Sequence, residues 1–135
     1  RGHFYVADFS ELPVSRQYHV VYSRFSLHAV PKASASRFLR WSHGSLKEAG
    51  LLCLEARSVK DSLYGHGDPV GEDPDAFVCS TSHAAAHYRR FINMQSLLQE
   101  LQDIGFTILH QQEEAGLSVY GEEDPVLIRI IAVKP

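Results

Sequence analysis

The apolar and polar positions of this chain switch between two periods, and this pattern predicts strands and helices in turn. Residues 3–8 are a short strand candidate. Residues 18–23 are rich in β-branched and aromatic side chains and stop on polar residues, as a buried parallel strand does in an α/β sheet. A helical pattern follows over 33–48, with Gly50 as its left-handed cap, and 51–57 is another predicted strand. Strand, helix and strand in this order predict one right-handed βαβ unit.

The second half of the chain is predicted to hold one helix and two further strands. Asn93 is a good N-cap for a helix that runs to Ile104 and ends at Gly105. Residues 106–110 and 126–133 have strand patterns, and a helix-free connection of roughly ten residues makes such strands antiparallel. The expected fold class is therefore α/β, with a mostly parallel sheet and an antiparallel last strand.

The segment between these halves, residues 58–84, shows no periodicity. It carries several glycines, prolines and acidic residues, so we predict a long loop, and such loops are often lids or binding segments. The acidic residues lack the fixed alternating positions of a calcium loop. We interpret them as solvated.

The bulk composition favours one soluble domain over residues 1–135. A net charge of −3 disfavours a nucleic-acid partner, and no apolar run approaches the length of a membrane span. Cys53 and Cys79 lie far apart in apolar or small-residue contexts, which indicates reduced, buried cysteines of a cytoplasmic protein. The chain begins at Arg1 and enters a strand pattern almost at once, so we expect that an N-terminal part is missing.

Polar side chains gather where the two best strands end. Ser23, Arg24 and His28 follow the first strand, and Glu55 and Arg57 follow the second. The carboxyl ends of parallel strands meet at one edge of a sheet, and ligands of such sheets bind there. We therefore expect these residues on one rim.

A histidine-rich segment precedes the last helix. His83 and His87 are four residues apart, which on a helix would suit two metal ligands. No glutamate follows the first histidine and no third ligand has matching spacing, so no metal is predicted. Either His87, Tyr88 and Arg89 or Arg90 contact a substrate, or they are surface or ion-paired residues.

The order of these segments resembles the carboxyl-terminal half of the class I S-adenosylmethionine-dependent methyltransferases, whose sheet has the strand order 3-2-1-4-5-7-6 with the seventh strand reversed. The resemblance covers essentially the whole chain. Residues 6–13 are similar to the end of the third strand, and residues 19–28 are similar to the fourth strand and its loop. Residues 46–52 are similar to the segment before strand five, with Glu48-Ala49 in place of proline-glycine. Residues 87–91, with Leu97-Leu98 and Ile104-Gly105-Phe106, are similar to the stretch before strand six.

This resemblance implies S-adenosylmethionine as the cofactor and a small methyl acceptor, which the basic rim suggests is anionic or sugar-like. The implied cofactor contacts are Asp8, Phe9, Ser23 and Arg24. The implied acceptor contacts are Glu55, Arg57, Tyr88 and Arg89, with His28 and His87 as candidate catalytic bases.

The resemblance begins at strand three, so the family's glycine-rich cofactor turn has no counterpart here. The sheet is expected to lack its first two strands, and the chain alone is expected to bind cofactor poorly. An upstream part of the same protein or a second copy would complete the sheet. Two alternatives stay open: a non-catalytic partner subunit that uses an exposed sheet edge, and another α/β enzyme that binds phosphorylated ligands.

Overall fold

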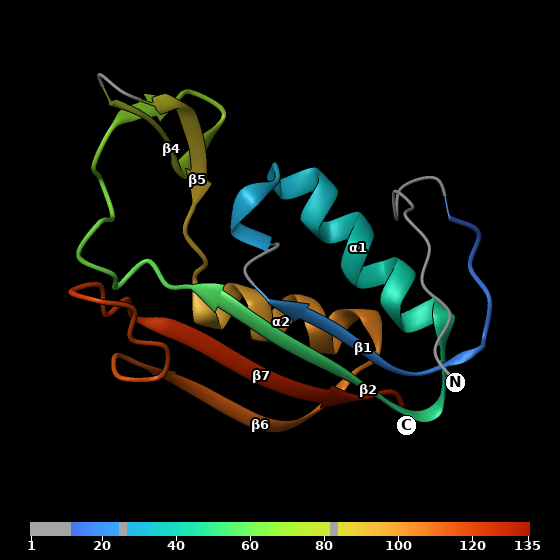
Figure 1. Cartoon of the computed structure of the whole chain (residues 1–135). Coiled ribbons are helices and arrows are strands. Elements are labelled where there is room, and N and C mark those ends of the chain that lie inside the picture. Colours follow the sequence, from blue (N-terminus) through green and yellow to red (C-terminus); the bar gives the residue numbers. More distant parts are fainter. Residues whose placement is uncertain (1–11, 25–26, 82–83) are drawn as a thin grey trace.

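The computed structural model describes residues 12–24, 27–81 and 84–135, and the expected strand at 3–8 lies outside this part (Figure 1). This part contains a main sheet, a small sheet, two helices and a short 3₁₀ turn. The elements are β1 (Tyr18–Arg24), η1 (Leu27–Ala29), α1 (Lys32–Ser45), β2 (Leu46–Arg57), β3 (Asp68–Val70), β4 (Asp73–Thr81), β5 (Ala84–Arg90), α2 (Met94–Ile104), β6 (Thr107–Glu114) and β7 (Leu127–Val133).

The main sheet has the strand order β1-β2-β7-β6. β1 and β2 are parallel, whereas β7 is antiparallel to both β2 and β6. The predicted α/β sheet with a reversed last strand is therefore confirmed. The expectation of a mostly parallel sheet needs correction, because β7 lies between β2 and β6 and leaves β1–β2 as the parallel pairing among the described strands.

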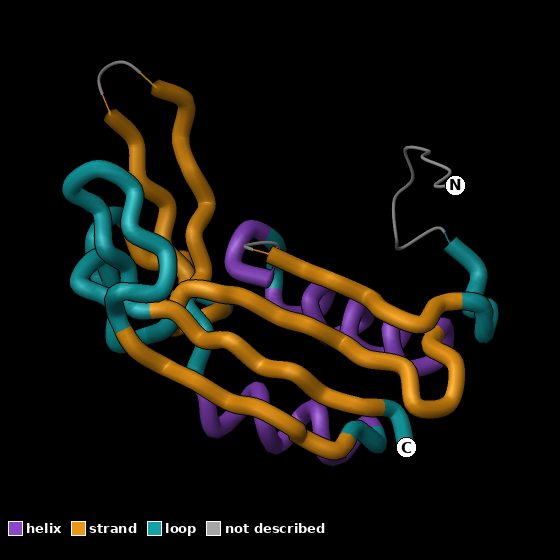
Figure 2. The backbone as a smooth tube through the Cα atoms, turned by 60° about the horizontal axis from the view of Figure 1, so that its bottom comes forward, coloured by secondary structure: helices purple, strands orange, loops and turns teal. Residues whose placement is uncertain are grey.

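Both helices lie on the same side of the four strands (Figure 2). Successive side chains of a strand point to opposite faces, and on the helix side the alternate positions are apolar. The core between sheet and helices is built from fully or nearly fully buried aliphatic side chains, among them Leu52, Leu54, Ala56, Ile128, Ile130, Ala132, Leu39, Leu97 and Leu101.

The opposite face of the main sheet is apolar over β1, β2 and β7 and open among the described residues, while β6 adds the polar Thr107 and His110 at its edge. One row across the strands contains Val20, Leu51 and Val133, and the next contains Tyr22, Cys53 and Ile131. Val20 is 53% exposed and Tyr22 is 65% exposed. Neither described helix packs on this face, so two rows of apolar side chains lie against solvent.

The boundary between α1 and β2 differs from the prediction. The helix ends at Ser45, and Gly50 lies inside β2 instead of capping the helix. Leu46 is fully buried and extended, so the helix ends at Ser45, five residues before the glycine. Lys134 Nζ donates to the carbonyl oxygens of His43 and Leu46 at 2.8 and 3.0 Å, which satisfies backbone groups at the helix end.

The prediction of a loop over 58–84 was wrong, because much of this segment folds into a second, antiparallel sheet of order β3-β4-β5. Three aromatic rings, Tyr64, Phe77 and Phe91, pack together beside it with centroids 5.3 to 6.0 Å apart. This sheet stands where β1 and β2 end (Figures 1 and 2).

The described part of the histidine-rich segment is a strand, so the spacing of its histidines does not place them on a helix face. His87 lies in β5 and pairs with Cys79 of β4, while His83 lies outside the described residues. Cys79 and Cys53 are both free, as predicted, but each is partly exposed instead of buried. No helix among the described residues combines the length and apolar character needed to cross a membrane.

The helix predicted after Asn93 is confirmed. The Asn93 side chain accepts a hydrogen bond from the Ser96 amide at 3.0 Å, and α2 ends at Gly105, whose φ of 124° suits glycine.

The buried face of α2 predicts a strong effect of truncation at Leu101. This side chain has no exposed surface, so Leu101→Ala is expected to lower the free energy of unfolding by about 2–5 kcal/mol. Leu109→Ala is the matched control, because Leu109 is 59% exposed and its truncation should cost less than about 1 kcal/mol. Urea denaturation measures both; equal losses would contradict the assignment of the core face.

The environment of His43 predicts a pH-dependent contribution to stability. Its ring packs edge-on against Phe106 at 4.9 Å, and burial, followed by the nearby Lys134 charge, lowers the pKa of His43 below its ordinary value of 6.5. At mildly acidic pH the unfolded chain therefore binds more protons than the folded chain does. The contribution of His43 to the free energy of unfolding is present above pH 6.5 and is lost as the pH falls through the folded-state pKa.

His43→Gln should therefore lose less stability than the wild type when the pH is lowered from about 8 to about 5. Urea denaturation at each pH gives the two slopes. Parallel slopes for the wild type and the variant would show that His43 does not contribute.

Candidate functional site

The carboxyl ends of β1 and β2 bring together the polar residues that were predicted to share a rim. Arg24 pairs in register with Glu55, and its Nε donates to Glu55 Oε1 at 3.1 Å. Arg57 lies two residues further along β2, and its Nη1 donates to Asp61 Oδ2 at 3.2 Å. Local strand patterns placed these residues at one edge, and the parallel register of β1 and β2 makes them neighbours.

Glu55 is the most constrained member of this rim. Its side chain is only 8% exposed, and its second oxygen accepts from Arg129 Nε of β7 at 2.7 Å. Arg24, Glu55 and Arg129 thus form one charged row across three strands. Because each carboxylate oxygen accepts from one arginine, Glu55 orients two guanidinium groups.

The two arginines also fix the connection between β6 and β7. Arg24 Nη2 donates to Ser118 Oγ at 3.0 Å, and Arg129 Nη2 donates to the carbonyl oxygen of Leu117 at 2.8 Å. Together this connection and the rim enclose a hollow of about 510 Å³, lined by Arg24, Arg57, Ser118, Val119, Tyr120, Glu123 and Pro125. The sequence did not predict that the connection between β6 and β7 lines this hollow, because residues 115–126 have no periodic pattern.

Ser23 and Arg24 lie on opposite faces of β1, since neighbouring side chains of a strand alternate. Ser23 is 4% exposed and lies on the helix side, whereas Arg24 lies on the open side. The Ser23 hydroxyl is buried without a hydrogen-bond partner among the described residues. The two residues predicted to contact one cofactor therefore lie on different sides of the sheet.

Arg90 ties the small sheet to the segment that follows β1. Its side chain is 10% exposed, and its Nη2 and Nε donate to the carbonyl oxygens of Leu27 and Val30 at 3.2 and 3.3 Å. Asp73 Oδ2 lies 3.9 Å from Arg90 Nε. His28 has its backbone in this segment, within η1, and its side chain lies outside the described part.

The candidate residues of β5 divide between the two faces of the small sheet. Tyr88 shares a face with Arg90, whereas His87 and Arg89 alternate onto the other face. His87 is exposed, while Tyr88 and Arg89 are half-buried. Burial, followed by the Asp73 charge, raises the pKa of Tyr88, so its phenol stays protonated near neutral pH. The face that turns toward η1 thus carries Tyr88 and not the other two candidates.

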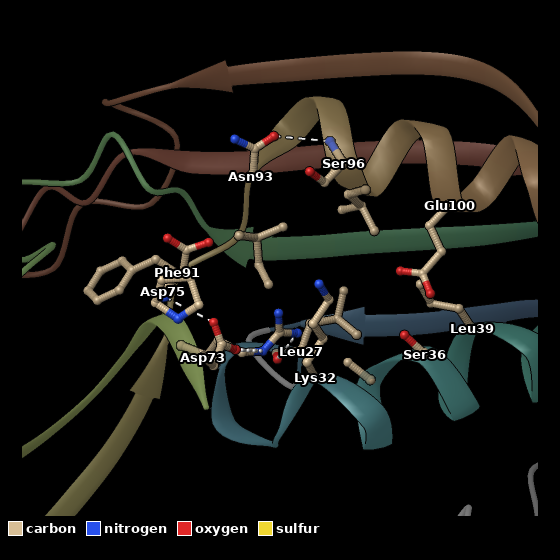
Figure 3. A pocket seen from close by; sticks show the side chains of 15 residues that line it. Leu27, Lys32, Ser36, Leu39, Asp73, Asp75, Phe91, Asn93, Ser96 and Glu100 are labelled. Atoms are coloured by element: carbon tan, nitrogen blue, oxygen red, sulfur yellow. Dashed lines mark hydrogen bonds and ion pairs between the residues drawn. The ribbon is translucent and has the colours of Figure 1, made fainter. Parts of the chain in front are cut away.

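A second cavity, of about 110 Å³, lies between η1, α1, α2 and the small sheet. Asp73 and Asp75 lie at one end of it and Ser36 and Glu100 at the other (Figure 3). Pockets for small organic ligands usually measure about 300–1,000 Å³, so this cavity has room for a few water molecules only. The hollow on the rim is the better candidate.

Asp8 and Phe9, the other two predicted cofactor contacts, lie outside the described residues. Among the residues that the structure describes, no three His, Cys, Asp or Glu side chains are grouped so that they could hold a metal ion.

Comparison with known proteins gives matches in structure alone. No protein-family model matches the sequence, and no curated protein matches it. A S-adenosylmethionine-dependent methyltransferase from Methanosarcina mazei superposes with a TM-score of 0.83 at 18% identity, over 99% of this chain and 68% of that one. The 1,6-didemethyltoxoflavin-N1-methyltransferase of Burkholderia thailandensis, solved with 1,6-didemethyltoxoflavin and S-adenosylhomocysteine, gives 0.62 at 15% identity, over 95% and 48%.

A third match, the [4+2]-cyclase SpnF, has a TM-score of 0.66 at 17% identity, over 98% of this chain and 55% of that one. Its name describes a different reaction, so the fold by itself does not fix the chemistry. This chain spans between 48% and 68% of the length of these three proteins. Taken together, the matches establish that the chain has a class I methyltransferase-like fold.

Proposed function

We propose that this chain is the carboxyl-terminal portion of a S-adenosylmethionine-dependent methyltransferase that acts on a small acceptor. The observation that carries the proposal is the superposition of 99% of the chain on the Methanosarcina mazei methyltransferase with a TM-score of 0.83. The polar rim at the ends of β1 and β2 supports it, because ligands of open α/β sheets bind beyond the carboxyl ends of the strands.

S-adenosylmethionine supplies an activated methyl group when it is bound. In the proposed site Asp8 and Phe9 contact the cofactor together with Ser23 at the end of β1, whose buried hydroxyl has no partner among the described residues. Arg24 lies on the other face of β1 and lines the rim hollow instead. These groups supply part of the contacts that such a cofactor needs, so we propose that the remaining contacts come from outside this chain. The rim hollow of about 510 Å³ lies within the usual size range of ligand pockets and is left for the acceptor.

The acceptor side of the site is proposed to use Arg57 and Tyr88, with Glu55 acting through the arginines that it holds. Arg89 lies on the other face of β5 and is left out of this proposal. Methyl transfer is an in-line displacement, so the protein mainly has to position the two reactants. If the acceptor group is a hydroxyl, His28 takes its proton as a general base in this proposal, because His87 lies on the other face of β5.

We further propose that an upstream part of the same polypeptide completes the sheet. Two features support this: β1 has no strand on its outer edge among the described residues, and the face that carries Tyr22 and Cys53 is open. The solved proteins that superpose on the chain are longer than it is. A second copy of the chain is the competing occupant, and the non-catalytic partner subunit would use the same surfaces.

Binding of S-adenosylhomocysteine tests the proposed function. The polypeptide encoded by the complete gene should bind it in calorimetry, and Asp8→Ala should weaken binding about tenfold, the effect of one hydrogen bond to a charged group. Asp103→Ala is the matched control, since Asp103 is exposed on α2 and bonds only to its helix neighbour Gln99 among the described contacts. Absence of binding, or equal binding by Asp8→Ala and wild type, would reject the proposal.

The alkylation rate of Cys53 tests how the open face is covered. Burial raises the pKa of this thiol and so lowers its thiolate fraction, and labelling with N-ethylmaleimide is therefore compared at one mildly alkaline pH in both proteins. Cys53 should react at least about tenfold more slowly in the complete polypeptide than in the 135-residue chain, because opening a covered site costs free energy.

Cys79 of the small sheet is the internal control, and its rate should be the same in both proteins. A Cys53 rate that falls as the concentration of the 135-residue chain rises would instead identify a second copy as the occupant. Equal rates for Cys53 in both proteins at every concentration would contradict coverage of this face.

A further inference from the structure

The rim hollow has two walls of different chemistry. On one side are the guanidinium groups of Arg24 and Arg57, which come from adjacent parallel strands. On the other side is the connection between β6 and β7, which contributes Val119 and Tyr120. A site with a charged wall and an apolar wall selects ligands that carry both kinds of group.

Tyr120 is the most exposed large hydrophobic side chain among the described residues, at 83%, and its neighbour Val119 is 61% exposed. Both line the same hollow. Large apolar side chains that gather on an exposed surface often mark an interaction site. An aromatic ring at such a place provides a flat face on which another ring can stack.

The backbone around Tyr120 is held in a defined turn. Tyr120 and Glu123 exchange two backbone hydrogen bonds, each 2.9 Å long, and Gly121 between them has a φ of 59°. The bonds from Arg24 and Arg129 fix the start of the same connection. The ring is therefore presented by an ordered segment, which reduces the entropy that binding would cost.

The opposite wall is equally well oriented. Arg24 is held by Glu55 and Ser118, and Arg57 is held by Asp61 and is only 13% exposed along its side chain. Planar guanidinium groups favour planar carboxylates and aromatic faces. Glu123 also lines the hollow, on the side of the turn, so an anionic group of a ligand belongs on the arginine side.

We propose that this hollow binds a flat aromatic molecule that bears a carboxylate, with its ring on Tyr120 and its carboxylate toward Arg24 and Arg57. The inference rests on the proposed function and names the acceptor class for it. Tyr120 is then a specificity-determining residue for the acceptor.

Three small probes separate recognition of the ring from recognition of the carboxylate. Benzoate is planar and charged, cyclohexanecarboxylate is charged but not planar, and benzamide is planar but neutral. In a chemical-shift titration of the complete polypeptide, benzoate should bind at least about fivefold more tightly than either of the others, which is the size of a single ring or charge contact. Equal affinity for all three, or binding of none, would overturn the inference.

Two variants at one position locate the contact. Tyr120→Ala should weaken benzoate binding at least about fivefold, whereas Tyr120→Phe keeps the ring and should bind as the wild type does. Tyr120 is exposed, so neither change should unfold the chain. If Tyr120→Ala binds benzoate as tightly as Tyr120→Phe, the ring is not the platform and the inference fails.

S-adenosylhomocysteine binding, measured on the same samples, separates this inference from the function on which it rests. Cofactor binding without preference for benzoate rejects the acceptor class and leaves the methyltransferase proposal intact. Preference for benzoate without cofactor binding rejects the methyltransferase proposal and leaves the aromatic acid site as that of another enzyme.

Discussion

The buried carboxylate of Glu55 is the constraint on which the open end of this fold depends. A carboxylate with 8% of its side chain exposed needs partners, and the in-register neighbours on β1 and β7 supply them as Arg24 and Arg129. A further donor of each arginine holds Ser118 or Leu117 in the β6–β7 connection. One ionised group thus couples three strands and a loop, and its removal would take away the carboxylate that the two guanidinium groups share.

This charged row also changes the character of the sheet along its length. On the open face the two rows nearer the amino ends of β1 and β2 are apolar, and the row at their carboxyl ends is ionic. Apolar rows are stabilised by being covered, while ionic groups keep water or a polar ligand nearby. The face is therefore divided into a part suited to packing and a part suited to binding, although every strand continues through both.

The small sheet is joined to the rim by a nearly buried cation, Arg90. Arg90 donates to the carbonyl oxygens of Leu27 and Val30, which lie just after β1. The backbone amide of Ile92 donates to the carbonyl oxygen of Arg57 at the end of β2 at 2.8 Å, which extends the connection to the second strand. The two sheets therefore meet where ligands of such folds bind, and a change in either sheet alters the same rim.

The sequence by itself determined the elements whose signals are local. The β-branched run of β1, the Asn93 cap and the Gly105 end of α2 need no distant partner to be recognised, and the polar stops after β1 and β2 placed Arg24 and Glu55 on one rim. Only the tertiary structure decided the small sheet, the early end of α1 and the wall formed by residues 115–126. Short strands among glycines, prolines and acidic residues have weak local preference, so pairing and burial of aromatic rings select them. The partners that hold each of these segments lie far away in the sequence, and no local period records them.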